Sequence, residues 1–296
     1  MTTEQLGLIG FGEAATEITR TIADAHQISL AAYDKLYQTK QACLVAGEGH
    51  SVRLLPTVAG LAAQADIIIS VVTADEAVAA AASLVPYIGP GHVFVDGNSV
   101  SPGTKAEAAK LVHKTGAAYV DMAIMAPIKP RGHQTPVLLA WSDQDRITAL
   151  FTAYDFAFDW EGESIGQVSL VKMIRSNLIK GVESLICESV TVAEQFGLDE
   201  RILASAGNTL GLEDVPALAD YLMERIAVHG RRRAAELREV AKTFSELGLS
   251  SHMPAATARH QDMVADMGLP GQFDGAVPED RQVLAVAMRA AQRAGK

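Results

Sequence analysis

Three polar side chains at helical spacing are the residues of this sequence most able to do chemistry. Lys172, Ser176 and Lys180 follow one another at intervals of four. A helix over 170–181 would therefore align them in one stripe, with Arg175 at its edge. The stripe combines cations with a hydroxyl group. It is either an ordinary solvated basic face or a place where an anionic substrate meets an amine that transfers protons.

The second interpretation defines a reaction. Oxidising an alcohol removes a hydride to a nicotinamide and a proton to a base, which must lie within hydrogen-bond reach of the hydroxyl oxygen. A lysine can be that base if burial or neighbouring cations lower its pKa from about 10.4 toward neutrality. We expect Arg175 and Lys180 to have that effect on Lys172 and to hold an anionic group of the substrate.

A glycine-rich turn near the N-terminus predicts a dinucleotide site. The apolar run 5–9 ends at Gly10 and a helical pattern follows, which is the strand, G-x-G-x-x-A and helix order of a dinucleotide-binding motif. Gly10 permits the tight turn, Gly12 lets backbone N–H groups approach a pyrophosphate, and Ala15 keeps helix and strand close. The cofactor contacts predicted for this turn are Gly10, Phe11, Gly12, Glu13 and Ala14.

The next apolar run, 28–33, ends at Asp34, about 20 residues beyond the glycines. A carboxylate there can accept hydrogen bonds from both ribose hydroxyls and repel a 2′-phosphate, which favours NAD. Lys35 opposes this preference, because a cation can pair with the 2′-phosphate of NADP. Asp34 is alternatively an ordinary turn residue. NAD is therefore the expected cofactor, and NADP is the alternative.

Short apolar runs then alternate with helical patterns. Strands are expected at 65–72, 92–95, 118–121, 137–141 and 155–158, and helices after Pro56, at 74–84 and at 104–114. This alternation predicts a doubly wound, mostly parallel sheet, whose ligands gather beyond the carboxyl ends of the strands. Val72 and Thr73 are expected at the nicotinamide ribose. Asn98 and Ser99 are expected at the carboxamide or the substrate hydroxyls, or as a turn cap.

From Glu163 onward the pattern is helical throughout. Helices are expected at 164–196, 201–207, 215–247 and 278–294, with breaks at Gly197, Gly211, Pro254 and Pro270-Gly271. The sequence therefore predicts a Rossmann domain over 1–162 and an all-α domain over 163–296, joined by a long helix. A helix of that length has to be covered on several sides, which indicates a homodimer formed through the helical domain.

Composition narrows the class of protein. The chain has 296 residues, of which 49% are hydrophobic, and its net charge of −10 argues against a general nucleic-acid or membrane-surface binder. Cys43 and Cys187 are far apart, and neither they nor the histidines show metal-ligand spacing, so no metal site is expected. The N-terminus lacks a signal-peptide pattern and no apolar run approaches about 18 residues, so we expect a cytoplasmic protein.

A second basic cluster, HGRRR, occupies 229–233 within a helical pattern. One interpretation is an ion-paired helix face, since Glu224, Glu236 and Glu239 are nearby. The other is a clamp for an anionic substrate, in which His229 and Arg232 face the same way and serve their own subunit or a partner.

The whole chain resembles the β-hydroxyacid dehydrogenase superfamily, which includes 6-phosphogluconate and 3-hydroxyisobutyrate dehydrogenases. Within it, the chain is most similar to the 6-phosphogluconate-dehydrogenase-like branch with a DUF1932-type C-terminal domain. The segments that carry the resemblance are GLIGFGEAA, DGNSVSP, Gly166 with Lys172, RSNLIKG, ERIAVHGRRRAAELREVAKTFSELGL and HMPAAT. The resemblance implies an NAD(P)-dependent enzyme that acts on a small anionic hydroxy compound, with Lys172 as general acid/base.

Several positions depart from the pattern of that family. Ser176 stands at the substrate-binding asparagine, Met125 at the substrate serine, and Pro127 and Val168 at glycines. The place for the substrate becomes more apolar, so we expect the reaction class to be kept and the usual substrate to change. Two alternatives stay open. One is an imine reductase, which usually carries Asp or Tyr in place of Lys172, and the other is a non-catalytic dinucleotide-binding protein.

Overall fold

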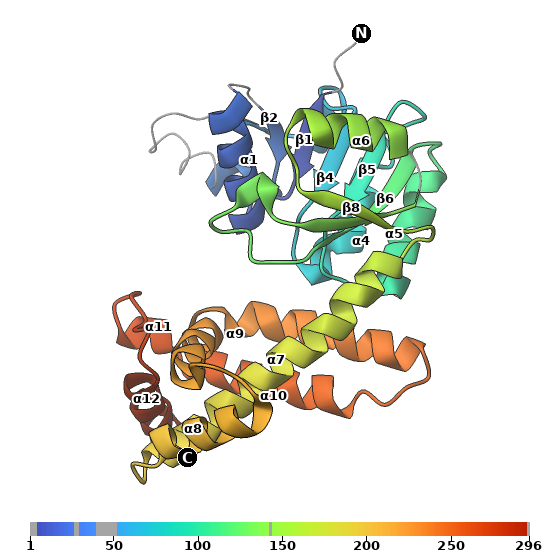
Figure 1. Cartoon of the computed structure of the whole chain (residues 1–296). Coiled ribbons are helices and arrows are strands. Elements are labelled where there is room, and N and C mark those ends of the chain that lie inside the picture. The colour runs from blue at the N-terminus through green and yellow to red at the C-terminus, as the bar shows by residue number, and fades with distance from the viewer. Residues whose placement is uncertain (1–4, 27–29, 40–51, 142–143, 295–296) are drawn as a thin grey trace. The chain divides into compact units, whose positions relative to one another are not determined.

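The computed structural model describes residues 5–26, 30–39, 52–141 and 144–294. The chain divides into two compact units, Met1–Met173 and Ile174–Lys296, and the division falls within one helix, α7 (Gln167–Glu194). The strand that precedes this helix ends at Gly162, where the sequence suggested a domain border. Figure 1 shows the strands in the first unit and the C-terminal helices in the second.

An eight-stranded sheet forms the centre of the first unit (Figure 1). Its strands lie in the order β3-β2-β1-β4-β5-β6-β7-β8. They are β1 (Leu6–Ile9), β2 (Leu30–Tyr33), β3 (Val52–Leu55), β4 (Ile67–Ser70), β5 (Val93–Asp96), β6 (Ala118–Ile124), β7 (Val137–Ala140) and β8 (Phe158–Gly162). Neighbouring strands are parallel except β6 and β7. The doubly wound, mostly parallel sheet predicted from the sequence is confirmed.

Helices cover both faces of this sheet, because successive strand residues point to opposite sides. The helices α1 (Glu13–His26) and α6 (Gln144–Ala153) share one core with strand residues such as Leu8 and Val95. The helices α3 (Val58–Ala62), α4 (Ala77–Leu84) and α5 (Pro102–His113) share the other core with Ile9 and Phe94. Two short 3₁₀ turns, η1 (Ala74–Glu76) and η2 (Gly132–Gln134), complete the unit.

The register of the strands brings their carboxyl ends level. Ile9 pairs with Tyr33 on one side and with Ser70 on the other, Ser70 pairs with Asp96, and Asp96 pairs with Asp121. Each of the four parallel strands β1, β2, β4 and β5 ends at this row. The residues that follow them therefore emerge along one edge of the sheet, where doubly wound proteins bind ligands.

The second unit consists, in its described part, of helices packed around a separate core. They are the rest of α7 with α8 (Asp199–Leu210), α9 (Val215–Glu246), α10 (His252–Asp266), α11 (Leu269–Gln272) and α12 (Arg281–Ala294). Buried residues from α7, α9 and α12, such as Val190, Ile226 and Leu284, form its centre. Gly230 allows α9 to approach α10 closely, because a Cβ there would lie 2.8 Å from the Gln261 carbonyl oxygen.

Some predicted elements were wrong. The strand expected at 155–158 begins only at Phe158, because Asp155 has a left-handed backbone (φ 55°) in the turn after α6, a helix that the sequence reading missed. The strand β3 was missed as well. Pro254 does not interrupt a helix: it lies in the first turn of α10, where a missing N–H removes no intrahelical bond.

Other expectations are refined. The long helix starts at Gln167 rather than Ser164 and ends at Glu194. Residues 28 and 29, which the sequence placed in the expected second strand, and Cys43 lie outside the described residues, while Cys187 is buried. Within the described part of the chain, no helix has the length and apolar character needed to cross a membrane.

Candidate functional site

The glycine turn has the geometry that the sequence predicted. Gly10 has φ +90°, its N–H donates to the Tyr33 carbonyl at 2.8 Å, and a Cβ there would lie 2.6 Å from the Val71 carbonyl oxygen. Only glycine fits such a position without strain. Gly12 is the opposite case: it is exposed, and a Cβ added to it would meet no atom within 4 Å. Open space therefore lies at the start of α1, where a pyrophosphate would bind.

The other residues predicted at this turn differ in what they can offer. The side chain of Phe11 is buried in the core of the sheet, so only its backbone faces the turn. Glu13 is exposed at the first position of α1, and Ala14 packs partly against the same core as Phe11. Ala15 is fully buried between α1 and the sheet, as predicted.

Asp34 lies at the end of β2 and joins the glycine turn. Its Oδ2 accepts a hydrogen bond from the Phe11 N–H at 2.7 Å, and its Oδ1 accepts one from the Leu36 N–H at 2.8 Å. The neighbouring Lys35 forms an ion pair with Glu76 of η1, with Nζ and Oε1 2.6 Å apart. The hydrogen bond to Glu76 raises the pKa of Lys35. The cation that was expected to compete for NADP is thus paired with a carboxylate.

Asn98 ties the ends of two strands together. Its side chain is buried, its Oδ1 accepts from the Val72 N–H at 2.7 Å, and its Nδ2 donates to the Ser70 hydroxyl at 2.9 Å. Both ends of the amide are therefore engaged within the protein. Ser99 is half-buried and Thr73 is exposed at the cap position of η1, without a side-chain capping bond. The turn cap in this region is Ser101, which accepts from the Thr104 N–H at the start of α5.

A buried charged cluster lies behind these loops. Lys105 is completely buried between two buried carboxylates, with its Nζ 3.1 Å from Asp96 Oδ1 and 3.2 Å from Asp121 Oδ1. Tyr119 donates to Asp96 Oδ2 at 2.8 Å, and burial together with both carboxylates raises the pKa of this phenol well above its usual value. Removing one partner of such a cluster costs about 3–5 kcal/mol, because an uncompensated charge is left buried.

The start of α7 is attached to this cluster. Asp121 Oδ2 accepts from the Gly166 N–H at 2.8 Å, and Asp121 Oδ1 accepts from the Ser169 hydroxyl at 3.0 Å. Lys172 follows Ser169 by three residues on α7 and is half-buried. Gln167, Val168 and Ser169 thus begin a helix whose first turn is held by a carboxylate of β6.

Two of the departures from the family pattern meet near this helix start. Val168 is fully buried with Ala123 and Ala140, and Met125 packs against the same small cluster. The Met125 N–H donates to the Pro136 carbonyl at 2.9 Å. A valine at a glycine position and a methionine at a serine position therefore contribute to one apolar contact, in agreement with the expected loss of polarity.

The remaining predicted residues belong to the helical unit. Lys180 is buried, with its Nζ 2.7 Å from Glu236 Oε2 and 2.5 Å from the Ser176 hydroxyl, and burial lowers its pKa although Glu236 acts in the opposite direction. Arg175 is exposed. Within the stripe predicted from the sequence, Lys180 is therefore already paired with a carboxylate.

The HGRRR cluster is partly an ion-paired surface. Arg231 pairs with Asp262 and Asp266 of α10, and the buried Arg233 pairs with Glu183 of α7. These partners come from neighbouring helices rather than from glutamates of the same helix. Of the two residues predicted to form an anion clamp, Arg232 is exposed, as Arg231 is, and His229 is half-buried.

Sequence reasoning missed the residues of the buried charged cluster. Asp96 and Asp121 each stand near the end of an apolar strand run, which is a signal for the carboxyl edge of a sheet. Lys105 gave no signal, because a lysine in the first turns of a helix usually lies on the surface. Among the described residues, no group of three or more His, Cys, Asp or Glu could hold a metal ion.

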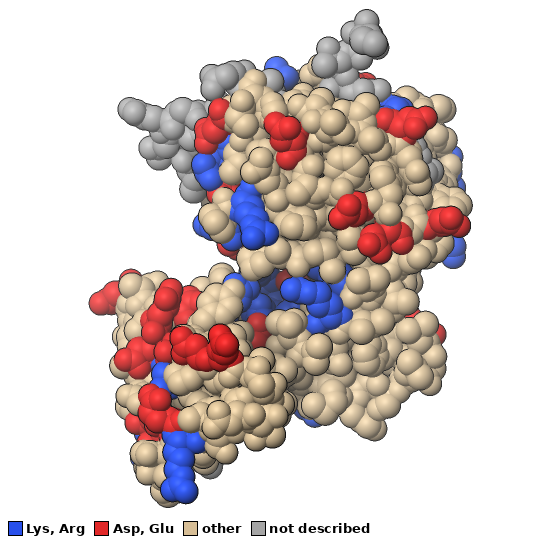
Figure 2. All heavy atoms as spheres, viewed as in Figure 1, with Lys and Arg blue, Asp and Glu red and all other residues tan. Residues whose placement is uncertain are grey.

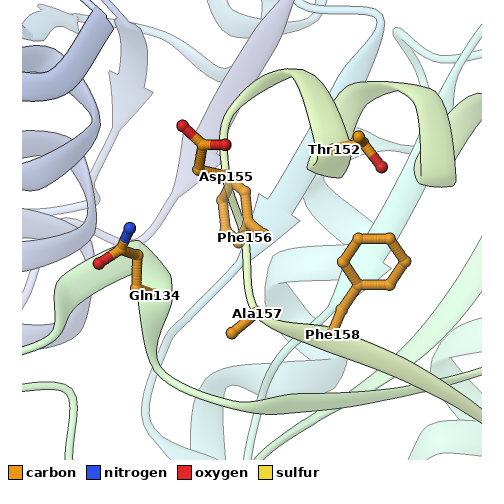
Figure 3. A pocket seen from close by; sticks show the side chains of 6 residues that line it. All are labelled: Gln134, Thr152, Asp155, Phe156, Ala157 and Phe158. Carbon is orange, nitrogen blue, oxygen red and sulfur yellow. The ribbon is translucent and has the colours of Figure 1, made fainter.

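A separate hollow of about 320 Å³ opens beside α6 and β8 (Figure 3). It is lined by Gln134, Thr152, Asp155, Phe156, Ala157 and Phe158. None of the residues predicted to bind cofactor or substrate lines it. The candidate site therefore rests on the carboxyl edge of the sheet and the start of α7, and not on this hollow.

Comparisons with known proteins agree with this geometry. Residues 5–126 match the NAD binding domain of 6-phosphogluconate dehydrogenase, and residues 193–264 match a domain of unknown function, DUF1932. A conserved hypothetical protein from Sinorhizobium meliloti 1021 is 32% identical, with 98% of this chain and 97% of that chain covered and a TM-score of 0.72. An uncharacterized 28.5 kDa protein of Methanothermus fervidus is 26% identical over 241 residues, 80% of this chain and 90% of that protein.

The fold is also that of characterised enzymes. The 3-hydroxyisobutyrate dehydrogenase of Mycobacterium tuberculosis superposes with a TM-score of 0.71 at 14% identity, covering 97% of this chain and 100% of that one. An imine reductase and a reductive aminase share the fold at 16% and 17% identity. The glycine turn, the doubly wound sheet and the match over 5–126 identify the first unit as an NAD-binding domain. The chain belongs to the β-hydroxyacid dehydrogenase superfamily, in its 6-phosphogluconate-dehydrogenase-like branch with a DUF1932-type C-terminal domain.

Proposed function

We propose that this protein is an NAD(P)-dependent dehydrogenase or reductase that interconverts an anionic hydroxy compound and its carbonyl partner, with Lys172 as general acid/base. The observation that chiefly supports this role is the attachment of α7 to Asp121. The two hydrogen bonds to Gly166 and Ser169 fix the start of the helix one turn before Lys172. Lys172 therefore stands on a rigid element, which proton transfer at a defined atom requires.

The proposed reaction needs few protein groups. The bound dinucleotide supplies the acceptor or donor of the hydride. In the oxidising direction a neutral Lys172 amine takes the proton of the substrate hydroxyl. The hydride leaves the carbon that bears this hydroxyl. In the reducing direction the protonated amine polarises the carbonyl and returns the proton to its oxygen. The open space at Gly12 and the exposed start of α1 fit a pyrophosphate, whose charge the helix N-terminus would stabilise.

The finer assignments are also proposals. NAD is the preferred cofactor, supported by the carboxylate of Asp34 at the glycine turn and by the pairing of Lys35 with Glu76. Arg175, Arg232 and His229 are proposed to bind the anionic group of the substrate. Because Lys180 and Ser176 are bonded to each other and Lys180 to Glu236, we expect them to support this group less directly than their spacing implied.

The test is the substitution Lys172→Ala, compared with Lys110→Ala, which removes an exposed lysine of α5. A panel of hydroxy acids and carbonyl acids is first screened by absorbance at 340 nm with each cofactor to find a turned-over substrate. We expect Lys172→Ala to lower kcat by about 10² or more while the Kd for NADH changes by only a few-fold, because the amine acts on the substrate. Lys110→Ala should leave both values unchanged.

Two results would contradict this proposal. A Lys172→Ala enzyme with near-wild-type kcat would exclude the lysine as acid/base. Turnover of cyclic imines, without turnover of any hydroxy or carbonyl acid, would instead assign the chain to imine reduction. Dinucleotide binding without turnover of either substrate class would favour the non-catalytic alternative.

A further inference from the structure

We propose that Asp121 is a positioning residue, which acts through the first turn of α7 to set the place and the reactivity of Lys172. This inference deepens the proposed function and rests on it for its kinetic test. The supporting observations are the contacts of the Asp121 carboxylate, the manner in which α7 begins, and the chain of buried hydrogen bonds that connects this carboxylate to the loop after β4.

Both oxygens of Asp121 are engaged, and all their partners donate. Oδ2 accepts from the Gly166 N–H at 2.8 Å, while Oδ1 accepts from the Ser169 hydroxyl at 3.0 Å and lies 3.2 Å from Lys105 Nζ. Asp121 and Lys105 are fully buried, and Ser169 nearly so. Such hydrogen bonds to an ionised acceptor are short and directional, so they fix the donors as well as stabilise them.

The backbone geometry shows how these hydrogen bonds hold the start of α7. Gly166 has φ +91°, and a Cβ there would lie 2.8 Å from Pro102 Cβ at the start of α5. The Gly166 carbonyl accepts the first helical bond of α7, from the Leu170 N–H at 2.8 Å. Gly166 is therefore the residue that caps α7, and Asp121 binds both this cap and the third helical residue. Lys172 follows one turn later, on the side of the helix that Ser169 shares.

The start of α7 is held differently from the starts of α5 and α9. The helices α5 and α9 are capped by their own preceding residues, Ser101 and Asp214. The carboxylate that binds the capping residue Gly166 comes from β6, 45 positions earlier in the sequence. A local cap would satisfy the helix end equally well. A cap from the sheet does more, because it fixes the start of the helix relative to the carboxyl edge where the dinucleotide turn lies.

The cluster behind Asp121 extends to that edge. Lys105 Nζ also lies 3.1 Å from Asp96 Oδ1, and the same oxygen accepts from the Asn98 N–H at 3.0 Å. The Asn98 side chain in turn holds the Val72 N–H. A series of hydrogen bonds and ion pairs, most of them buried, thus joins the loop after β4, predicted at the nicotinamide ribose, to the start of the helix that carries Lys172. Displacements of about 1 Å at such distances from the chemistry can cost 10²-fold in rate.

The principal variant is Ser169→Ala, which removes one donor to Asp121 and keeps the Gly166 N–H bond. Its control is Ser83→Ala, which removes a hydroxyl that donates to a helix carbonyl in α4, away from this cluster. We expect Ser169→Ala to lower kcat about tenfold and to leave the Kd for NADH within about twofold of wild type. Ser83→Ala should change neither value.

A second readout does not depend on turnover. Reductive methylation with formaldehyde and cyanoborohydride, followed by peptide mass spectrometry, gives the labelling rate of Lys172 as a function of pH, with Lys110 as internal reference. We expect the pH profile of Lys172 to move by a measurable fraction of a pH unit in Ser169→Ala, with Lys110 unchanged. This measurement decides the positioning role even if no substrate of the wild-type protein is found.

Asp121→Asn provides a stronger perturbation at similar volume. Its amide has one acceptor oxygen to meet three donors, so its NH₂ group must face either Lys105 or a backbone N–H. We expect the same direction of change as for Ser169→Ala and a larger size. If this variant does not fold, Ser169→Ala decides alone. A lower Tm with unchanged kcat and an unchanged Lys172 labelling profile in Ser169→Ala would overturn the proposal and leave Asp121 a purely structural residue.

Discussion

At the scale of single residues, the spacing along the sequence predicted one determinant of cofactor choice and missed another. The position of Asp34 after the second strand was sufficient to expect a carboxylate beside the glycine turn, and its hydrogen bond to the Phe11 N–H agrees with that expectation. The pairing of Lys35 with Glu76 was not visible in the sequence, because Glu76 follows a different strand. Asp34 favours NAD and Lys35 favours NADP. Glu76, which lies near Lys35 only in the folded chain, pairs with this lysine and so weakens the preference for NADP.

This arrangement predicts that two substitutions shift the cofactor preference in the same direction, toward NADP(H), for different reasons. Asp34→Ala removes the ribose acceptor and the charge that repels a 2′-phosphate, so the preference for NAD should narrow or invert. Glu76→Gln releases Lys35, so NADPH should bind a few-fold more tightly while NADH binding stays nearly constant. Fluorescence titration with NADH and NADPH measures both effects. Asp24→Asn, which removes one exposed carboxylate paired with Arg20 on α1, controls for the change in net charge.

The prediction has clear ways to be wrong. Tighter binding of NADPH than of NADH by the wild-type protein would mean that Asp34 does not select the cofactor. An increase in NADPH affinity in Asp24→Asn equal to that in Glu76→Gln would mean that overall charge, and not the release of Lys35, is responsible.

At the scale of elements, motifs that are local in sequence were predicted well and contacts that are distant were not. The glycine turn with its strand and helix depends on a few consecutive residues, and the structure confirms it. The buried position of Lys105 and the cap of α7 depend on strands β5 and β6 meeting in register, which no local pattern encodes. The apolar Phe156 is similarly ambiguous: it is buried in the core, yet it precedes β8 rather than forming part of a strand.

The start of α1 offers a prediction at this scale. The Cβ added by Gly12→Ala would meet no atom of the protein within 4 Å. The Tm of this variant should therefore fall by no more than about 4 °C, because alanine is a poorer helix cap than glycine. The added methyl group would nevertheless occupy the space needed by a pyrophosphate, so the Kd for NADH should rise at least tenfold. Gly91→Ala is the matched control, since a Cβ there also meets nothing and Gly91 lies outside the turn.

Calorimetry and NADH titration of the two variants check this expectation. Unchanged NADH binding in Gly12→Ala would show that the pyrophosphate does not approach the start of α1. Equal losses in both variants would point instead to a general effect of glycine replacement.

At the scale of the whole molecule, the sequence predicted two units of different class and the structure bears this out. It could not predict which apolar side chains of α7 are left exposed by the helical unit itself. Figure 2, viewed as Figure 1, shows acidic and basic side chains on the visible faces of both units. Along α7 the side chains of Ile174, Leu178, Leu185 and Val192 are 52%, 66%, 55% and 58% exposed. Their successive intervals of four, seven and seven residues place them in one stripe.

This stripe is the basis of a prediction about assembly. The stripe runs from Ile174 to Val192, about 27 Å along α7, and such a row of exposed large apolar side chains is unusual on a monomer. We propose that a second copy of the chain covers it about a two-fold axis, which would bring the same stripe of both copies together. Light scattering at micromolar concentration should then give twice the chain mass of 31.4 kDa.

A double substitution separates this explanation from others. Leu178→Glu with Leu185→Glu introduces like charges at the centre of a self-paired stripe, so it should convert the dimer to monomers while the Rossmann unit still binds NADH. Tyr87→Glu, at an equally exposed site of the first unit, should leave the mass unchanged. A wild-type protein that is monomeric and active at these concentrations would contradict the proposal. A dimer that persists in the double variant would show that the copies associate through another surface, and that the stripe on α7 is covered in some other way.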